Sequence, residues 1–403
     1  MTAQIKLKHS GGNGVIIEAP ANNPASDKTI ALPSTESGVF ATKNSANSLQ
    51  NVTGINGGQL SNRNLIINGS QIIDQRNSGS AVTVSNASVT YVTDRFSLYE
   101  DTDGVISAQQ STTSPDGFTK SIKVDCTTVD TSLASSQRLV FEHRIEGNNI
   151  AHLGFGSSAA KTITLSFYVK SNLTGTFGGS IKNSDSNRVY IFSYSISSAN
   201  TWERKTITIA GDTSGTWLIT NGTGININWG LALGSDWVGS AGSWGTSDKH
   251  GVTGQLNLLS STDNEWLITG VQLEVGSTAT DFEHRSFGQE LALCMRYYEK
   301  SFPYDTAPAN NASSGSISIN GCFFTDSHNN SNRGAVRFKV EKRASPSLTK
   351  YGNSQGRWYS PDTGFHANNN SANGPDPTGF YPRQQASGSV IRMQGHYAAD
   401  AEL

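Results

Sequence analysis

Apolar and polar residues alternate along the middle of the chain, between about residues 64 and 282. Val82 and Val84 stand between polar neighbours at the start of this region. The same alternation recurs in residues 163–170, 190–196, 207–209, 225–233 and 271–275. Gly- and Ser-rich turns separate these segments, and none of them has helical spacing. The pattern predicts an all-β fold, an antiparallel β-sandwich of the jelly-roll type over residues 63–285.

The first 62 residues have a different pattern. Ile5 and Leu7 alternate with lysines, a glycine-rich turn follows, and Val15 begins a second apolar run. Beyond it the chain is polar and interrupted by prolines. We predict one or two short strands and then an extended linker. Because so few apolar residues cannot bury a core alone, we expect this segment to be ordered by a partner surface or by copies of itself.

A single helix is predicted after the sandwich, at residues 286–300. Ser286 and Gln289 fit a capping box, in which both side chains satisfy free N–H groups of the first turn. The apolar residues that follow at helical spacing are Phe287, Leu291, Cys294, Met295 and Tyr298.

The last hundred residues return to short strands. Apolar alternation marks residues 317–319, 336–341 and 390–393, and a polar region with scattered aromatic residues lies at 350–382. We interpret residues 301–403 as a second, smaller β domain.

Composition narrows the possible functions. Only 15% of the 403 residues are charged and the net charge is −2, so the chain lacks the basic excess expected of a nucleic-acid-binding protein. No apolar run approaches the ~18 residues of a membrane span, and residues 1–14 lack the apolar core of a secretory signal. We therefore expect no nucleic-acid partner, no membrane insertion and synthesis in a cytoplasm.

Candidate catalytic and metal-binding residues are sparse. Cys126, Cys294 and Cys322 lie far apart, which suits neither a disulfide framework nor a zinc site. His143 and His152 are too few and too separated for a metal centre. The carboxylates that could serve glycoside hydrolysis by type are Glu142, Glu146, Asp263 and Glu265, and their spacing selects no pair. The sequence therefore assigns no catalytic residue, no metal and no cofactor.

Aromatic residues in polar loops are the candidate binding residues. Trp237 and Trp244 lie in a Gly/Ser-rich loop at residues 234–254, and Trp358, Tyr359 and Tyr381 lie in the C-terminal polar region. Exposed rings can stack on sugars while Asn, Asp and Ser supply hydrogen bonds. The alternative is that these rings anchor loops that have little other core. If the chain binds a glycan, we expect the C-terminal region to be the first site and the 234–254 loop the second.

Several stretches, taken in order, resemble the jelly-roll domain of bacteriophage tail-fibre and related virion structural proteins. The opening NLIING (residues 64–69) and DRF (94–96) resemble its first strands, and YAADAEL (397–403) its usual chain ending. Between these lie IEGNNIAHLGF (145–155), KTITLSFYVKSNLTG (161–175), NTWERKTITIAGDTSGTW (200–217) and ITGVQLEVGSTATDFEHRSFGQELALCMRYYEK (268–300). One departure is Asp281, where the family commonly has Pro before the Phe.

The resemblance implies a non-enzymatic fibre subunit of a virion. It implies a homotrimer or another oligomer, attached to other virion proteins of the tail, neck or capsid through residues 1–62, with distal β domains exposed to the host. We expect these domains to adhere to a host surface polysaccharide. In such a trimer the helix near Leu291 and Met295 would be buried between subunits, unless its apolar stripe lies on its own sandwich. The alternatives are a capsid or neck decoration fibre without receptor binding, and a virion-borne glycan depolymerase.

Overall fold

The chain forms two compact units, residues 1–52 and 53–403. The computed structural model describes residues 4–8, 14–18, 42–43, 49–50, 62–85, 87–312, 314–320, 335–352, 356, 358, 372–382 and 392–403. In the first unit, β1 (Gln4–Lys8) and β2 (Gly14–Glu18) form an antiparallel hairpin with Ile5 opposite Ile17. A second pair is β3 (Thr42–Lys43) with β4 (Leu49–Gln50). The prediction of one or two short strands at the start of the chain is confirmed by β1 and β2, and most of the predicted linker lies outside the described residues.

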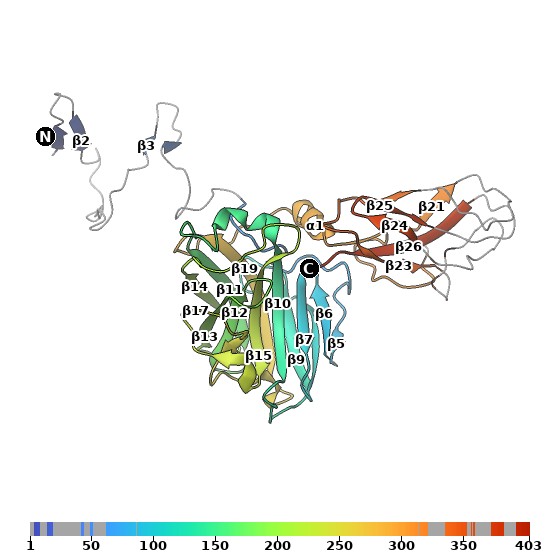
Figure 1. Ribbon diagram of the computed structural model, residues 1–403, viewed down its shortest axis with the longest axis horizontal. Helices are drawn as coiled ribbons and strands as arrows, with labels where there is room; N and C mark the ends of the chain where they lie inside the picture. The colour runs from blue at the N-terminus through green and yellow to red at the C-terminus, as the bar shows by residue number, and fades with distance from the viewer. Residues whose placement is uncertain are drawn as a thin grey trace. The chain divides into compact units, whose positions relative to one another are not determined.

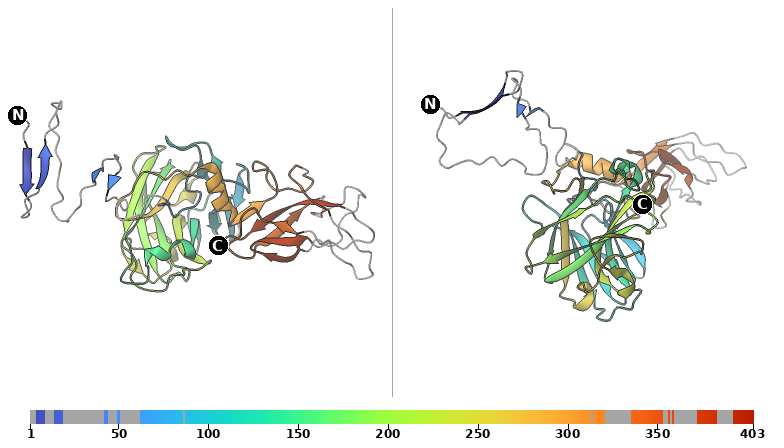
Figure 2. Two further views of the ribbon diagram at one scale, coloured as in Figure 1. Left: turned by 90° about the horizontal axis from the view of Figure 1, so that it is seen from above. Right: turned by 60° about the vertical axis from the view of Figure 1, so that its left-hand side comes forward.

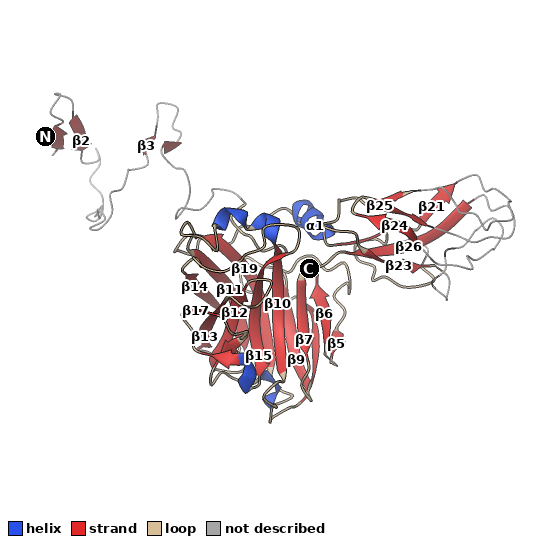
Figure 3. Ribbon diagram, viewed as in Figure 1, coloured by secondary structure: helices blue, strands red, loops and turns tan. Residues whose placement is uncertain are grey.

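The second unit contains a β-sandwich of two antiparallel sheets (Figures 1 and 3). The first sheet has seven strands in the order β17-β13-β12-β15-β10-β7-β6. Their bounds are β6 (Ser88–Thr93), β7 (Phe96–Glu100), β10 (Arg138–Glu146), β12 (Gly175–Lys182), β13 (Val189–Ile196), β15 (Thr223–Leu233) and β17 (Trp244–Gly245). The predicted all-β sandwich is confirmed.

The second sheet has six strands in the order β14-β11-β19-β9-β8-β5. Their bounds are β5 (Val82–Val84), β8 (Val105–Ser111), β9 (Ser121–Thr128), β11 (Ile163–Ser171), β14 (Glu203–Ile209) and β19 (Glu265–Val275). A parallel pair, β16 (Val238–Gly239) with β18 (Gly251–Val252), lies in the long 234–254 loop. The 3₁₀ turns are η1 (Gly147–Asn149), η2 (Ala151–Leu153), η3 (Ser235–Trp237) and η4 (Leu258–Ser260).

The two sheets face each other (Figure 2), and the core fills the space between them. Alternate residues of each strand point inward, so the seven-stranded sheet contributes Phe141 and Trp229 and the six-stranded sheet contributes Phe167 and Trp266. The Trp229 ring contacts Phe141 and Phe167 at centroid distances of 5.6 and 5.7 Å, and Trp266 lies 5.5 Å from Phe141. All four side chains are buried, and this aromatic cluster joins the sheets.

Helix α1 (Phe287–Met295) begins where the sequence predicts it, with the Gln289 N–H donating to Ser286 Oγ over 3.4 Å. It ends five residues early. The next residues form β20 (Tyr298–Lys300), which pairs with the last strand and therefore leaves the helical conformation. Cys294 is buried against Ile67 and Ile73 of the same chain. The apolar stripe of the helix thus packs on its own chain, which is the second of the two predicted arrangements.

The C-terminal region forms two small sheets. One has the order β20-β26-β21, with β23 also paired to β26, and the other has the order β22-β25-β24. The bounds are β21 (Ile317–Asn320), β22 (Val336–Arg337), β23 (Ser347–Tyr351), β24 (Ala372–Asp376), β25 (Gly379–Pro382) and β26 (Arg392–Asp400). Among the described residues of the whole chain, no helix is long and apolar enough to cross a membrane.

One C-terminal strand is shorter than the sequence predicts. The alternation at 336–341 predicts a strand of that length, but β22 ends at Arg337. The main-chain N–H groups of Lys339 and Val340 donate instead to the buried carboxylate of Glu299, at 3.0 and 3.3 Å. Lys342 Nζ completes this site at 2.8 Å, with both side chains fully buried. A buried charge must be satisfied by such bonds, and here they override the strand pattern.

Candidate functional site

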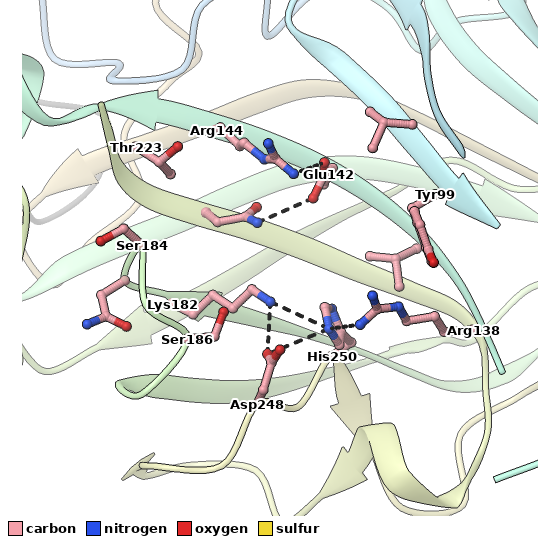
Figure 4. Close-up of a pocket in the computed structure, with 14 residues that line it drawn as sticks. Tyr99, Arg138, Glu142, Arg144, Lys182, Ser184, Ser186, Thr223, Asp248 and His250 are labelled. Carbon is pink, nitrogen blue, oxygen red and sulfur yellow. Dashed lines mark hydrogen bonds and ion pairs between the residues drawn. The ribbon is translucent and has the colours of Figure 1, made fainter. Parts of the chain in front are cut away.

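A groove of about 450 Å³ lies on the face of the seven-stranded sheet that points away from the core. This volume falls within the ~300–1,000 Å³ of ordinary ligand sites. Strands β6, β7, β10, β12 and β15 supply its floor, and the loops at 183–186 and 248–250 supply its walls (Figure 4). The side chains that line it are Val89, Tyr99, Arg138, Val140, Glu142, Arg144, Lys182, Asn183, Ser184, Ser186, Thr223, Asn226, Asp248 and His250.

The period of two along β10 explains how this sheet face becomes polar. Leu139 and Phe141 point into the core, so Arg138, Glu142 and Arg144 point into the groove. The same alternation on β15 places Asn226 in the groove. One sequence pattern therefore builds the core on one side of the sheet and the groove on the other.

The 234–254 loop closes one end of the groove by lying directly on the sheet. Two glycines allow this close approach. A Cβ on Gly178 would come within 2.5 Å of the Val252 nitrogen, and one on Gly230 within 3.0 Å of the His250 carbonyl oxygen. Gln255 Nε2 then donates to the Gly230 carbonyl oxygen over 2.8 Å. The loop is held in this position, and it presents Asp248 and His250 to the groove.

Charged side chains form a row along one wall (Figure 4). Lys182 Nζ lies 2.8 Å from Asp248 Oδ1 and 3.5 Å from His250 Nε2. Arg138 Nη1 lies 3.0 Å from the same His250 nitrogen. Burial lowers the pKa of Lys182, an effect that the Asp248 carboxylate opposes.

His250 is neutral in this row. Burial, reinforced by the charges of Lys182 and Arg138, holds the pKa of His250 well below its ordinary value of 6.5. A guanidinium can only donate, so Nε2 accepts the bond from Arg138 and the ring proton lies on Nδ1. That Nδ1 is buried and has no partner within the described part of the protein.

A second cluster surrounds Glu142 on the floor of the groove. Arg144 Nη2 lies 2.8 Å from Glu142 Oε1, and Ser97 Oγ donates to the same oxygen over 3.2 Å. Asn226 Nδ2 donates to the other carboxylate oxygen over 3.3 Å. This bond fixes the amide so that Asn226 Oδ1 is left buried without a partner, in a side chain that is only 8% exposed. This unpaired acceptor belongs to a side chain that lines the floor of the groove.

The structure places the five aromatic candidates in different surroundings. Trp237 lies behind Arg138, whose guanidinium carbon is 3.8 Å from the ring centroid, and its Nε1 donates to the Ser136 carbonyl oxygen. It supports the groove without lining it. Trp244 packs at the edge of the core, 5.4 Å from Tyr190 and 5.5 Å from Trp217.

Of the C-terminal candidates that the structure describes, one is buried and one is exposed. Trp358 is 1% exposed, and its Nε1 donates to the His396 carbonyl oxygen over 2.8 Å. It fills the core of the small sheets with Phe380 and Tyr397, because that region has few other large apolar residues. The prediction that Trp358 offers a stacking face therefore needs correction. Tyr381 is 48% exposed, and Tyr359 lies outside the described residues.

The predicted carboxylate candidates are also dispersed. Glu142 lies in the groove, whereas Glu146 is held by Arg296 and Tyr297 at 2.7 Å each. Glu265 pairs with Lys123 on the other sheet at 3.1 Å. Within the described ranges no cluster of His, Cys, Asp and Glu has the arrangement of a metal site.

The sequence pattern did not predict the charged groove residues Arg138, Arg144, Lys182 and Asp248, nor Asn226, as site residues. For the first two, the polar positions of residues 138–144, opposite Leu139 and Phe141, are the signal that could have found them. Gly178 and Gly179 precede Lys182 in the chain and suggest a turn, although the structure has strand β12 there. Asp248 comes from a loop, and only the fold brings it to the sheet.

No family model matches the chain, and no curated protein matches it in sequence. Several solved structures overlap with it at low TM-scores. The enzymatically active domain of tailspike protein 4 from Bacteriophage CBA120 gives a TM-score of 0.27 at 15% identity, and the match covers 53% of this chain. This chain spans only 21% of the length of that tailspike chain.

Two carbohydrate-binding modules also overlap with the chain. A family 11 module from Clostridium thermocellum, in complex with a β-1,3-1,4-mixed-linked tetrasaccharide, gives a TM-score of 0.25 at 12% identity, over 49% of this chain and 96% of the module. TmCBM61, in complex with β-1,4-galactotriose, gives 0.25 at 9% identity, over 53% of this chain and 99% of the module. These likenesses concern the β-sandwich fold alone.

Proposed function

We propose that this chain is a non-enzymatic fibre subunit of a bacteriophage virion that binds a host surface glycan in the groove on the seven-stranded sheet. One observation carries the binding proposal. Asn226 Oδ1 is a buried acceptor without a partner, and it lies on the floor of an open groove. A buried polar atom without a hydrogen bond costs stability, so a ligand that donates to it gains affinity.

The lining favours a sugar over an apolar ligand. Val89 and Val140 are the aliphatic side chains of the groove, and the rest carry hydrogen-bonding groups. Most ligand pockets are lined chiefly by apolar side chains. A surface of donors and acceptors matches a molecule covered in hydroxyl groups.

The groove carboxylates support binding without hydrolysis. Glycoside hydrolysis needs one carboxyl group that carries a proton for the leaving oxygen. Glu142 is already engaged by Arg144, and Asp248 by Lys182. Both groove carboxylates are thus occupied by cations of the same chain.

The virion assignment rests on the sequence resemblance to tail-fibre proteins, and on residues 1–52 forming a unit of their own that suits attachment to other virion proteins. The proposal of a homotrimer rests on the same N-terminal segment. Helix α1 gives it no support, because α1 packs on its own chain. Deleting residues 1–62 should leave a folded sandwich that no longer enters particles. Sedimentation of the full chain as a monomer at micromolar concentration would contradict the trimer.

Affinity electrophoresis in gels containing host surface polysaccharide tests the binding proposal. The wild-type chain should be retarded, Asn226→Ala should lose most of the retardation, and Tyr381→Ala should keep it. Retention by Asn226→Ala with loss by Tyr381→Ala would move the site to the C-terminal region. New reducing ends in the polysaccharide would favour the depolymerase instead.

A further inference from the structure

The charges in the groove are not balanced. Its lining carries three cations and two carboxylates. Arg144 pairs with Glu142, and Lys182 pairs with Asp248. Arg138 has no carboxylate partner among the described residues, and its single side-chain hydrogen bond goes to the neutral ring of His250. One guanidinium charge in the groove is therefore uncompensated.

The surroundings of Arg138 hold that guanidinium ready for a ligand. Its guanidinium carbon lies 3.8 Å from the Trp237 ring centroid and 4.7 Å from that of Tyr99. Contacts with the two ring faces fix the plane of the guanidinium and do not neutralise its charge. A guanidinium carries five N–H donors, and His250 takes one of them. The remaining donors are fixed in orientation before any ligand arrives, which lowers the entropy lost on binding.

We propose that Arg138 binds a carboxylate of the glycan, so that the ligand is an acidic polysaccharide containing uronic acid. This inference rests on the proposed function and names its substrate class. A planar carboxylate fits the guanidinium fork with two parallel hydrogen bonds. The negative charge of the ligand carboxylate then neutralises the positive charge of Arg138, which no carboxylate of the described residues neutralises.

A second, independent feature of the groove matches the other half of such a sugar. Asn226 Oδ1 accepts and needs a donor, which a sugar hydroxyl supplies and a carboxylate does not. Asn226 and Arg138 line the same groove. A free acceptor and a free cation together select a ligand that carries both hydroxyl and carboxylate groups.

The test uses the full-length protein and matched pairs of polysaccharides. Polygalacturonate, polyglucuronate and alginate are each compared with their carboxyl-reduced forms by isothermal titration, and dextran sulfate is added as a non-carboxylate polyanion. We expect wild-type protein to bind at least one carboxylated member about 10- to 100-fold more tightly than its reduced form, as for a hydrogen bond to a charged group. Dextran sulfate should bind more weakly than that member.

Variants separate recognition from a structural role. Arg138→Gln should remove the preference and bring both forms to the same affinity, and Arg138→Lys should lie between, because it keeps the charge without the fork. Arg204→Gln, an exposed arginine on β14 of the other sheet, removes the same charge and should keep the preference. Arg138→Gln could instead weaken the binding of the carboxylated and the reduced polysaccharides equally, or lower the thermal midpoint so far that unfolding explains the weaker binding. In either case Arg138 is structural and the inference is overturned.

The remaining outcomes distinguish the two proposals. Equal binding of the carboxylated and reduced forms by wild-type protein overturns the acidic-ligand inference and leaves glycan binding in place. Preference for dextran sulfate over every carboxylated member also overturns the inference, because it indicates a general polyanion site. Failure of all members to bind overturns the acidic-ligand inference, and the gels that contain host surface polysaccharide then decide whether glycan binding in the groove fails as well.

Discussion

Arg138 donates through Nη1 to Nε2 of His250 over 3.0 Å, and this bond joins a strand of the sandwich to the loop that closes the groove. It requires a neutral imidazole, since a protonated ring has no acceptor. The groove is therefore assembled around a histidine that must not take up a proton. Part of the acid response of the protein follows from this arrangement, beside that of buried His143, whose pKa is also held well below 6.5 by burial.

Replacing His250 should flatten the acid side of the stability curve. The pKa of His250 is well below 6.5 in the folded chain because of burial and the nearby cations, and close to 6.5 when unfolded. As the pH falls below 6.5, the unfolded chain therefore binds more protons than the folded chain does. The contribution of His250 to the free energy of unfolding is present above pH 6.5 and is lost as the pH falls toward the pKa of the folded state. His250→Gln should lower the slope of unfolding free energy against pH by up to one proton in this range.

Chemical denaturation between pH 7 and pH 4.5 measures that slope. His284→Gln, which replaces an exposed histidine, is measured beside it for comparison. An unchanged slope in His250→Gln would mean that His250 is not kept neutral.

The buried pair of Glu299 and Lys342 should dominate the stability of the C-terminal sheets. Both side chains are fully buried, and Lys342 Nζ also donates to the Met295 and Val340 carbonyl oxygens. Lys342→Met leaves the Glu299 charge without its cation, and such losses cost about 3–5 kcal/mol. Urea denaturation should show this cost. Lys123→Met, which breaks a partly exposed lysine–carboxylate pair, should cost less than about 1 kcal/mol, and equal costs would contradict the argument.

Trp358→Ala should destabilise the small sheets strongly. The ring is buried against Phe380 and Tyr397, and truncating a buried tryptophan costs about 3–5 kcal/mol. Tyr381→Ala, on an exposed side chain nearby in sequence, should change stability by no more than about 0.5 kcal/mol. Tryptophan fluorescence during denaturation follows the tyrosine variant, and circular dichroism follows both. A stable Trp358→Ala variant would return this ring to the candidate binding surface.

Adding a methyl group at Gly178 should disturb the groove through the loop. Its Cβ would meet the Val252 nitrogen at 2.5 Å, so Gly178→Ala must push the 234–254 loop off the sheet. We expect a loss of about 1–3 kcal/mol of stability from overpacking, and weaker retardation in polysaccharide gels. Gly288→Ala is the matched control, because nothing lies within 4 Å of its Cβ and it should bind normally. Normal binding by Gly178→Ala would show that loop position does not shape the groove.

The alternation of residues predicted the sandwich because each strand that has one face in the core must repeat with period two. Strand β10 escaped prediction since buried His143 and Val140 blur its alternation, although Leu139 and Phe141 keep the inward face apolar. Residue type alone also does not predict whether Trp358 is buried, because a tryptophan suits a core and a sugar-binding surface equally. Contacts between distant segments decided both cases.

The helix shows the same limit on a smaller scale. Ser286 and Gln289 are local signals, and the predicted start is confirmed. The end depends on Tyr298 meeting Asp400, which are about a hundred residues apart in the chain. Local signals therefore predict where elements begin, while pairing with distant strands determines where they stop.

The central claim is that glycan binds in the groove between Arg138 and Asn226, and a crystal structure of the full-length protein with its best-binding oligosaccharide tests it most directly. The account predicts sugar density on the outer face of the seven-stranded sheet. A carboxylate should lie within hydrogen-bond distance of the Arg138 guanidinium, and a hydroxyl within that distance of Asn226 Oδ1. Density beside Tyr381, with an empty groove, would contradict the account.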